Sequence, residues 1–261
     1  MRPYAGLLAA ALALTAVGCA TANRSFSGEL KYKRTAEGNI KAGEEEFKRG
    51  NYADAEKFFD YTKNRFPFSP LAATGELRAA DSKFEQERYL EAADAYQRFA
   101  KLHPNNEAVD RAVFRAGLCL YKQGPTDFLV FPPSYELDLH QVRAAVTQLE
   151  EFVKGYPSSQ YLPEAKKILA EGKDELAEND WYAANFYARR HRWAGVAGRL
   201  ETLIKDYPGT RHETEAMMKL AQTYLEMKER FRAQQTLQKL IAEHPADSRR
   251  VEAEKLLASI R

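Results

Sequence analysis

Apolar side chains recur at helical spacing along most of the chain, and the pattern repeats ahead of five prolines. These are Pro67, Pro104, Pro157, Pro208 and Pro245, and an aromatic or imidazole ring precedes each of them. Twelve residues before each proline stands a small side chain, at Ala55, Ala92, Ala145, Val196 and Ala233. Eight residues before it stands a large one, at Phe59, Tyr96, Leu149, Leu200 and Leu237, and five residues before it the column reads Thr62, Phe99, Phe152, Leu203 and Leu240. Steps of three and four residues place these columns on one face of a helix that the proline ends.

The spacing of these prolines predicts a repeat array and not a single globular core. Successive prolines are 37, 53, 51 and 37 residues apart, and the shorter step is close to the period of helical-hairpin repeats. A small residue facing a large one lets two antiparallel helices pack closely, which is the pattern of the tetratricopeptide repeat. The sequence therefore predicts an all-α solenoid of about five tetratricopeptide-like hairpins, with a C-terminal capping helix over about 249–260.

The two longer steps contain insertions of 16 and 14 residues. The first lies within 124–138, where Pro132 and Pro133 exclude a helix although residues 128–131 are apolar. Two interpretations of this loop stay open: it folds back over the array, or it binds a partner. The second insertion lengthens one helix to about 30 residues, over about 161–190. We expect Phe186 and Trp193, in and after this stretch, to lie in the core.

The first residues predict an export signal and a lipid anchor. A charged start and an apolar stretch over 4–17 precede Gly18 and Cys19, which is typical of a signal peptide over 1–18. The tetrad at 16–19 resembles a bacterial lipobox, in which Cys19 takes a diacylglycerol and becomes the mature N-terminus. Residues 19–35 are then the lipidated N-terminus and a flexible tether, and 36–261 the repeat domain.

Composition and motifs exclude several other functions. Lysine and arginine number 39 against 37 aspartates and glutamates, and no basic tract could neutralise many phosphates, so we expect no nucleic-acid partner. The chain has no metal-binding, phosphate-loop or nucleophile-elbow motif. We therefore expect no enzyme activity, no catalytic or metal-binding residue and no cofactor. Cys119 lies in an apolar helical stretch and is predicted to be a buried thiol without a redox role.

Three stretches give the chain a resemblance to the BamD family, the tetratricopeptide lipoproteins of the outer-membrane β-barrel assembly machinery. They read RFPFSP at 65–70, KGYPSSQY at 154–161 and ARRHRWAGV at 188–196. The likeness covers about 36–227, although the loop at 124–138 departs from the charged pattern of the family. It implies a noncatalytic scaffold, lipid-anchored on the periplasmic face of the outer membrane. The implied partners are the POTRA region of the barrel-inserting subunit, the C-terminal signals of unfolded β-barrel substrates, and other lipoproteins of the machinery.

The resemblance also implies where these partners bind. Arg199 matches the arginine of the partner-facing motif, and Arg190 lies one element earlier, so both would contact the POTRA region. Tyr52, Phe66 and Phe68 would contribute to a pocket for the substrate peptide. Because Arg199 flanks the buried columns, its guanidinium is expected to be exposed, and replacing it by glutamate is expected to weaken binding while the fold stays intact.

A second interpretation keeps the solenoid and changes the partner. Periplasmic tetratricopeptide adaptors that coordinate cell-envelope or cell-division proteins share the Tyr-Pro ending seen at 207–208. Such adaptors usually carry a coiled-coil segment before the repeats and lack a lipobox. No heptad run separates Cys19 from the first hairpin, which favours the barrel-assembly interpretation.

Overall fold

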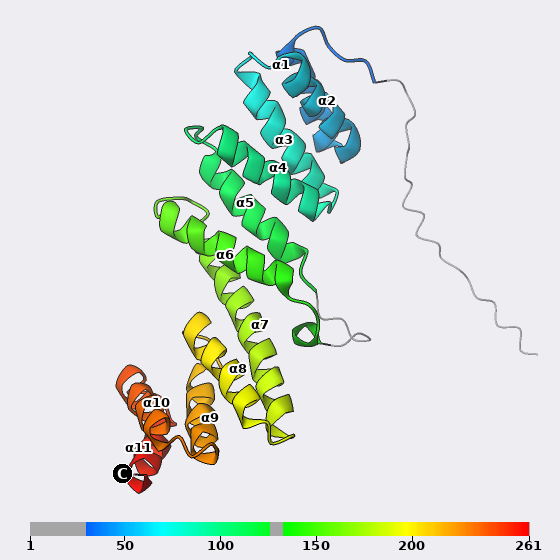
Figure 1. Cartoon of the computed structure of the whole chain (residues 1–261). Coiled ribbons are helices and arrows are strands. Elements are labelled where there is room, and N and C mark those ends of the chain that lie inside the picture. Colours follow the sequence, from blue (N-terminus) through cyan, green and yellow to red (C-terminus); the bar gives the residue numbers. More distant parts are fainter. Residues whose placement is uncertain (1–29, 126–132, 261) are drawn as a thin grey trace, which may run out of the picture. The chain divides into compact units, whose positions relative to one another are not determined.

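The computed structural model describes residues 30–125 and 133–260, and Tyr32–Arg261 form one compact unit. The described residues contain eleven α-helices and one short 3-10 helix, η1 (Ser134–Glu136), and no strand (Figure 1). The predicted signal peptide and Cys19 lie outside the described residues, as do residues 126–132 of the first insertion.

The helices pair in sequence order as five hairpins and a closing helix. The first two hairpins are α1 (Ala36–Lys48) with α2 (Tyr52–Arg65), and α3 (Leu71–Glu85) with α4 (Tyr89–Leu102). The next three are α5 (Val109–Lys122) with α6 (His140–Gly155), α7 (Leu162–Ala188) with α8 (Trp193–Asp206), and α9 (Glu213–Glu226) with α10 (Arg230–Glu243). The closing helix, α11 (Arg250–Ser259), packs on α10. This order confirms the predicted all-α array of tetratricopeptide-like hairpins with its capping helix.

The ring before each repeat proline ends the second helix of its hairpin. The backbone N–H of this residue donates to the carbonyl four residues earlier, at Phe66, His103, Tyr156, Tyr207 and His244. The five residues share φ between −129° and −124° and ψ between 54° and 61°. Because a following proline disfavours the α conformation, the same sequence feature ends all five helices in the same way.

The predicted columns form the core of the array. Every residue of the small column is 0% exposed, and every residue of the two larger columns is at most 1% exposed. The helices approach closely where these columns meet: a Cβ built on Gly117 of α5 would lie 2.8 Å from Cδ2 of Leu149 on α6. The register read from the prolines is therefore the register of the packing.

Enlarging the small column is expected to destabilise the array. Ala145 is fully buried on α6, so Ala145→Leu should lower the free energy of unfolding by about 1–3 kcal/mol through overpacking. Glu91→Gln is the matched control, because Glu91 is exposed and pairs with Arg88, three residues earlier, and we expect it to be nearly silent. Urea unfolding followed by circular dichroism measures both. An Ala145→Leu variant as stable as the wild type would contradict the packing register.

The long helix and the described end of the first insertion meet. α7 has 27 residues, close to the roughly 30 that the sequence predicts, and Pro163 lies in its first turn, where a missing N–H is tolerated. η1 packs on α7: Nδ2 of Asn179 donates to the carbonyl oxygen of Tyr135 at 2.6 Å. The Tyr135 ring also lies 5.4 Å from that of Tyr182. The described end of the loop thus lies against the array, while both interpretations of the loop remain open.

Two of the predictions about individual core residues are confirmed and one is wrong. Trp193 packs partly buried against the core, and Cys119 is fully buried. Burial raises the pKa of the Cys119 thiol to about 12, which keeps it protonated and unreactive. Phe186, predicted in the core, is instead 39% exposed. The many aromatic residues of α7 gave no indication that this position faces outward. The guanidinium of Arg190 covers the Phe186 ring at 3.6 Å from its centroid.

Candidate interaction surfaces

An aromatic cluster lies at the end of the first hairpin, where α2 stops. Tyr32 stacks on Tyr61 with ring centroids 4.2 Å apart and meets Phe58 edge-on at 5.5 Å. Phe66 lies 6.2 Å from Tyr61, and Phe68, just beyond it, is 99% exposed. These rings form an apolar surface of stacked and exposed aromatics, which we call the N-terminal aromatic cluster.

A buried asparagine fastens the segment that carries Tyr32. Asn39 of α1 is 0% exposed and accepts from the backbone N–H of Lys33 at 2.8 Å. Its Nδ2 donates to the carbonyls of Lys33 and Thr35 at 2.8 and 2.7 Å. The last residues before α1, predicted to be part of the tether, thus pack against the body of the array.

The structure does not bring the three predicted substrate-pocket residues together. Tyr52 opens α2, where its ring lies 5.0 Å from that of Phe47. Phe66 is the C-cap of the same helix, so about 20 Å of helix separates the two ends. Phe66 and Phe68 belong to the N-terminal aromatic cluster, and Tyr52 does not. The family resemblance implied these three residues as one pocket, and it gave no information on their separation along α2.

Arg199 is half exposed and has an intramolecular partner. Its Nη1 donates to Oδ1 of Asp180 on α7 at 2.9 Å, with the Arg199 side chain 47% exposed and that of Asp180 only 4% exposed. Burial raises the pKa of Asp180 above its usual value, while the bond to Arg199 opposes that rise. The predicted exposure therefore holds in part, but Arg199 also compensates a buried charge. The sequence signal for this partner was an aspartate directly before the aromatic-rich stretch at 181–187 of α7.

Arg190 lies elsewhere on the same hairpin. It belongs to the turn after α7, is exposed, and donates from Nη1 to the carbonyl oxygen of Phe186 at 3.2 Å. Arg199 lies six residues into α8, about 9 Å farther along that helix axis. The two predicted partner-binding arginines thus lie on one hairpin but not next to each other.

A second buried aspartate, which sequence reasoning missed, joins the first three hairpins. The side chain of Asp81 on α3 is 5% exposed and accepts from Nη1 of Arg78 at 2.7 Å, from Nη2 of Arg111 at 2.6 Å and from the Tyr96 hydroxyl at 2.6 Å. Arg78 also binds both carboxylate oxygens of Glu44 on α1, at 2.6 and 2.7 Å. We call these residues the Asp81 network. It has two acids and two bases, so its charges balance.

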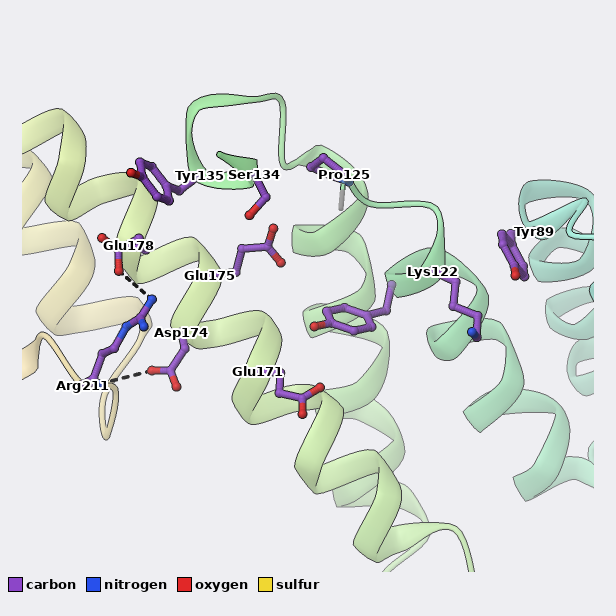
Figure 2. Close-up of a pocket in the computed structure, with 11 residues that line it drawn as sticks. Tyr89, Lys122, Pro125, Ser134, Tyr135, Glu171, Asp174, Glu175, Glu178 and Arg211 are labelled. Atoms are coloured by element: carbon purple, nitrogen blue, oxygen red, sulfur yellow. Dashed lines mark hydrogen bonds and ion pairs between the residues drawn. The ribbon is translucent and has the colours of Figure 1, made fainter. Parts of the chain in front are cut away.

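A cleft of about 870 Å³ opens beside η1 and α7. In Figure 2, Glu171, Asp174, Glu175 and Glu178 follow one another along α7, facing Lys122 of α5 and Arg211 from the segment before α9. Arg211 Nη2 pairs with Glu178 at 2.6 Å, and its backbone N–H donates to Asp174 at 3.2 Å. The acidic wall suits a cationic segment and repels a peptide carboxylate. Among the described residues, no group of acids, histidines or cysteines is arranged to hold a metal ion.

The hairpin array with its surface arginines and aromatics defines an all-α scaffold, and comparisons with known proteins give its family. The YfiO family model, described as outer membrane lipoprotein, matches residues 34–255. The chain belongs to this family of outer membrane lipoproteins. Within the part of the chain that the structure describes, no helix combines the length and apolar character needed to cross a bilayer.

Similar curated proteins carry the name outer membrane protein assembly factor BamD. The one from Neisseria gonorrhoeae is 26% identical over 84% of this chain and 83% of its own. Those from Haemophilus influenzae and Caulobacter vibrioides are 25% and 24% identical, over 87% and 86% of this chain and 86% and 70% of theirs. A solved thermophilic tetratricopeptide protein of Thermus thermophilus is also similar, at 15% identity and a TM-score of 0.36, over 87% of this chain and 98% of that one. The relatives' names describe an assembly factor and not an enzyme, and they favour the barrel-assembly interpretation over the adaptor.

Proposed function

We propose that this chain is a scaffold of the outer-membrane β-barrel assembly machinery, which binds the POTRA region of the barrel-inserting subunit through the α7–α8 hairpin. The observation that carries the proposal is Arg199, a half-exposed guanidinium held in place by the buried Asp180. A fixed cation gives up little conformational freedom on binding and can offer its remaining N–H groups to a carboxylate. Arg190, exposed on the turn before α8, is the second contact.

The N-terminal aromatic cluster is our proposed site for the substrate signal. Phe68 is almost fully exposed, and it lies two residues after Phe66, whose ring meets that of Tyr61 at 6.2 Å. Flat apolar surfaces of this kind bind the apolar and aromatic residues of an extended peptide. The acidic cleft beside α7 is a poorer candidate, because a C-terminal signal brings its own carboxylate.

We further propose that Cys19 carries the lipid anchor and holds the body on the periplasmic face of the outer membrane. Family membership supports a lipoprotein, and Cys19 follows an apolar export signal directly. Two or more acyl chains anchor a protein stably where a single one does not. Other assembly lipoproteins are further candidate partners.

Testing the POTRA contact requires a variant that leaves no uncompensated charge. The pair Asp180→Asn with Arg199→Gln removes both members of the ion pair, and we expect it to weaken binding to the purified POTRA region at least about tenfold, or ~1.4 kcal/mol. A binding titration with the detergent-solubilised protein measures this effect.

Asp180→Asn alone is the matched control. It keeps the guanidinium but no longer holds it in place, so binding should weaken less than in the double variant. If the double variant binds as well as the wild type while its circular dichroism is unchanged, the α7–α8 hairpin is not the interface, and the loop at 124–138 becomes the next candidate.

A further inference from the structure

The turn between α7 and α8 presents four consecutive basic residues. Arg189, Arg190, His191 and Arg192 are all exposed. His191 has a positive φ of 53°, which tightens the turn, and Figure 1 shows the turn at the end of the α7–α8 hairpin. Three guanidiniums therefore lie within four residues of a protruding element, in a chain whose net charge is only +2.

Arginines at the turns of the first two hairpins are neutralised by nearby glutamates. Arg49 pairs with Glu46 after α1, and Arg88 pairs with Glu56 and Glu91 before α4. Within the described residues, neither Arg189 nor Arg192 has a carboxylate partner within 4.0 Å. Their charge is thus available to an external anion.

Two aromatic residues, one on each side, flank this group of cations in the sequence. Phe186 is exposed one turn before Arg190. Trp193, half buried, follows Arg192 directly, and its ring meets that of His191 edge-on at 5.5 Å. Exposed arginine next to tryptophan and phenylalanine is the composition that proteins place at the headgroup level of a bilayer, where cations meet phosphate and rings bridge the apolar boundary.

We propose that Arg189, Arg192 and Trp193 of this basic aromatic turn dock on the surface of an anionic phospholipid membrane. The chain belongs to a family of outer membrane lipoproteins, and the inference rests on the proposed lipid anchor, which would keep a lipid surface close to the chain. A protruding turn also fits a flat surface better than a concave one. The inference goes beyond the proposed function, because it assigns a lipid surface, and not a protein, to Arg189, Arg192 and Trp193.

Tryptophan fluorescence in vesicles tests this docking with the lipidated full chain. The chain has two tryptophans, and Trp181 stacks on His212 away from the turn, so Trp193→Phe supplies the background. Acyl-brominated lipids quench a tryptophan that reaches the membrane. We expect quenching of Trp193 in phosphatidylcholine vesicles that contain phosphatidylglycerol, and its loss in phosphatidylcholine alone or at high salt.

Charge reversal locates the contact. Arg189→Glu with Arg192→Glu is expected to abolish the phosphatidylglycerol-dependent quenching. Lys166→Glu with Lys167→Glu, an equal charge change at exposed positions of α7, should retain it. Circular dichroism checks both folds, and the salt dependence of the wild type tests the idea even where a variant fails to fold.

Quenching that ignores phosphatidylglycerol and salt, or that both double variants lose equally, would overturn the proposal. The result is independent of the POTRA titration, which contains no anionic lipid. A turn that instead binds an acidic protein would show no dependence on phosphatidylglycerol.

Discussion

Replacing Asp81 by alanine is expected to lower the free energy of unfolding by about 3–5 kcal/mol. The substitution leaves the two arginines that Asp81 holds, Arg78 and Arg111, without their shared acceptor, and the buried Tyr96 hydroxyl loses its partner. Glu44 can still compensate Arg78, but no other carboxylate pairs with Arg111 among the described residues. The cost arises from burying an unpaired charge, not from the loss of one contact.

Urea unfolding of the Asp81→Ala variant measures this loss. Asp54→Ala is the matched control, because Asp54 pairs with Lys57 on the surface of α2, and exposed pairs contribute at most about 1 kcal/mol. Equal stabilities of the two variants would show that the Asp81 network does not join the first three hairpins. A smaller loss confined to the first transition of a two-step curve would instead restrict its effect to those hairpins.

The helical array could be predicted because its determinants are local and repeated. The turn before each proline and the small residue twelve positions earlier act within one hairpin, so Ala55 and Ala233 report the same packing at opposite ends of the array. Repetition also identifies buried positions that a single residue would not reveal. Thr62 is polar, yet it is buried like the other members of its column, and its hydroxyl donates to the Phe58 carbonyl. Even the extension of α7 followed from the absence of a turn.

The polar contacts between helices could not be predicted in the same way. Asp81 and Arg111 are 30 residues apart in the sequence. No local sequence pattern relates two residues at that separation. One aspartate on a helix is ordinarily a solvated charge, and only the packed hairpins show that Asp81 and Asp180 are buried. The prediction that Phe186 lies in the core was wrong for a related reason. Hydrophobicity alone does not reveal which position of an aromatic-rich helix faces outward.

The two buried aspartates, Asp81 and Asp180, share one structural arrangement. Each lies on the first helix of its hairpin and holds an arginine from a later helix: Asp81 holds Arg111, and Asp180 holds Arg199. In a solenoid, whose repeats contact only their neighbours, such pairs fix one helix against a later helix of the same or the next hairpin. They also leave part of the guanidinium at the surface, so a packing device can present a cation to a partner. Mutating such an arginine therefore changes stability and binding together.

Arg199→Glu is accordingly expected to destabilise the protein by about 3–5 kcal/mol, in contrast to the intact fold that its sequence position suggested. Among the described residues, Arg199 is the only cation that forms an ion pair with Asp180. The change removes this cation and places a second carboxylate beside Asp180. Arg199→Lys keeps the charge and should lose less than about 1 kcal/mol. Thermal or urea unfolding compares the variants, and equal losses for both would mean that geometry, and not charge, determines the effect.

The pH dependence of Arg199→Gln separates charge burial from lost packing. Burial raises the pKa of Asp180 above 3.8 even with Arg199 present, and removing the arginine should raise it further, so the folded variant binds a proton more tightly than the unfolded chain. Its free energy of unfolding must then fall as pH rises from the usual aspartate pKa through the raised one. We expect Arg199→Gln to approach wild-type stability at low pH, where Asp180 is protonated, and to fall behind near neutrality. Because Asp180→Asn cannot ionise at this position, adding it to Arg199→Gln should abolish the difference in pH dependence. A deficit that stays constant with pH would show that Arg199 stabilises the hairpin through packing of its side chain alone.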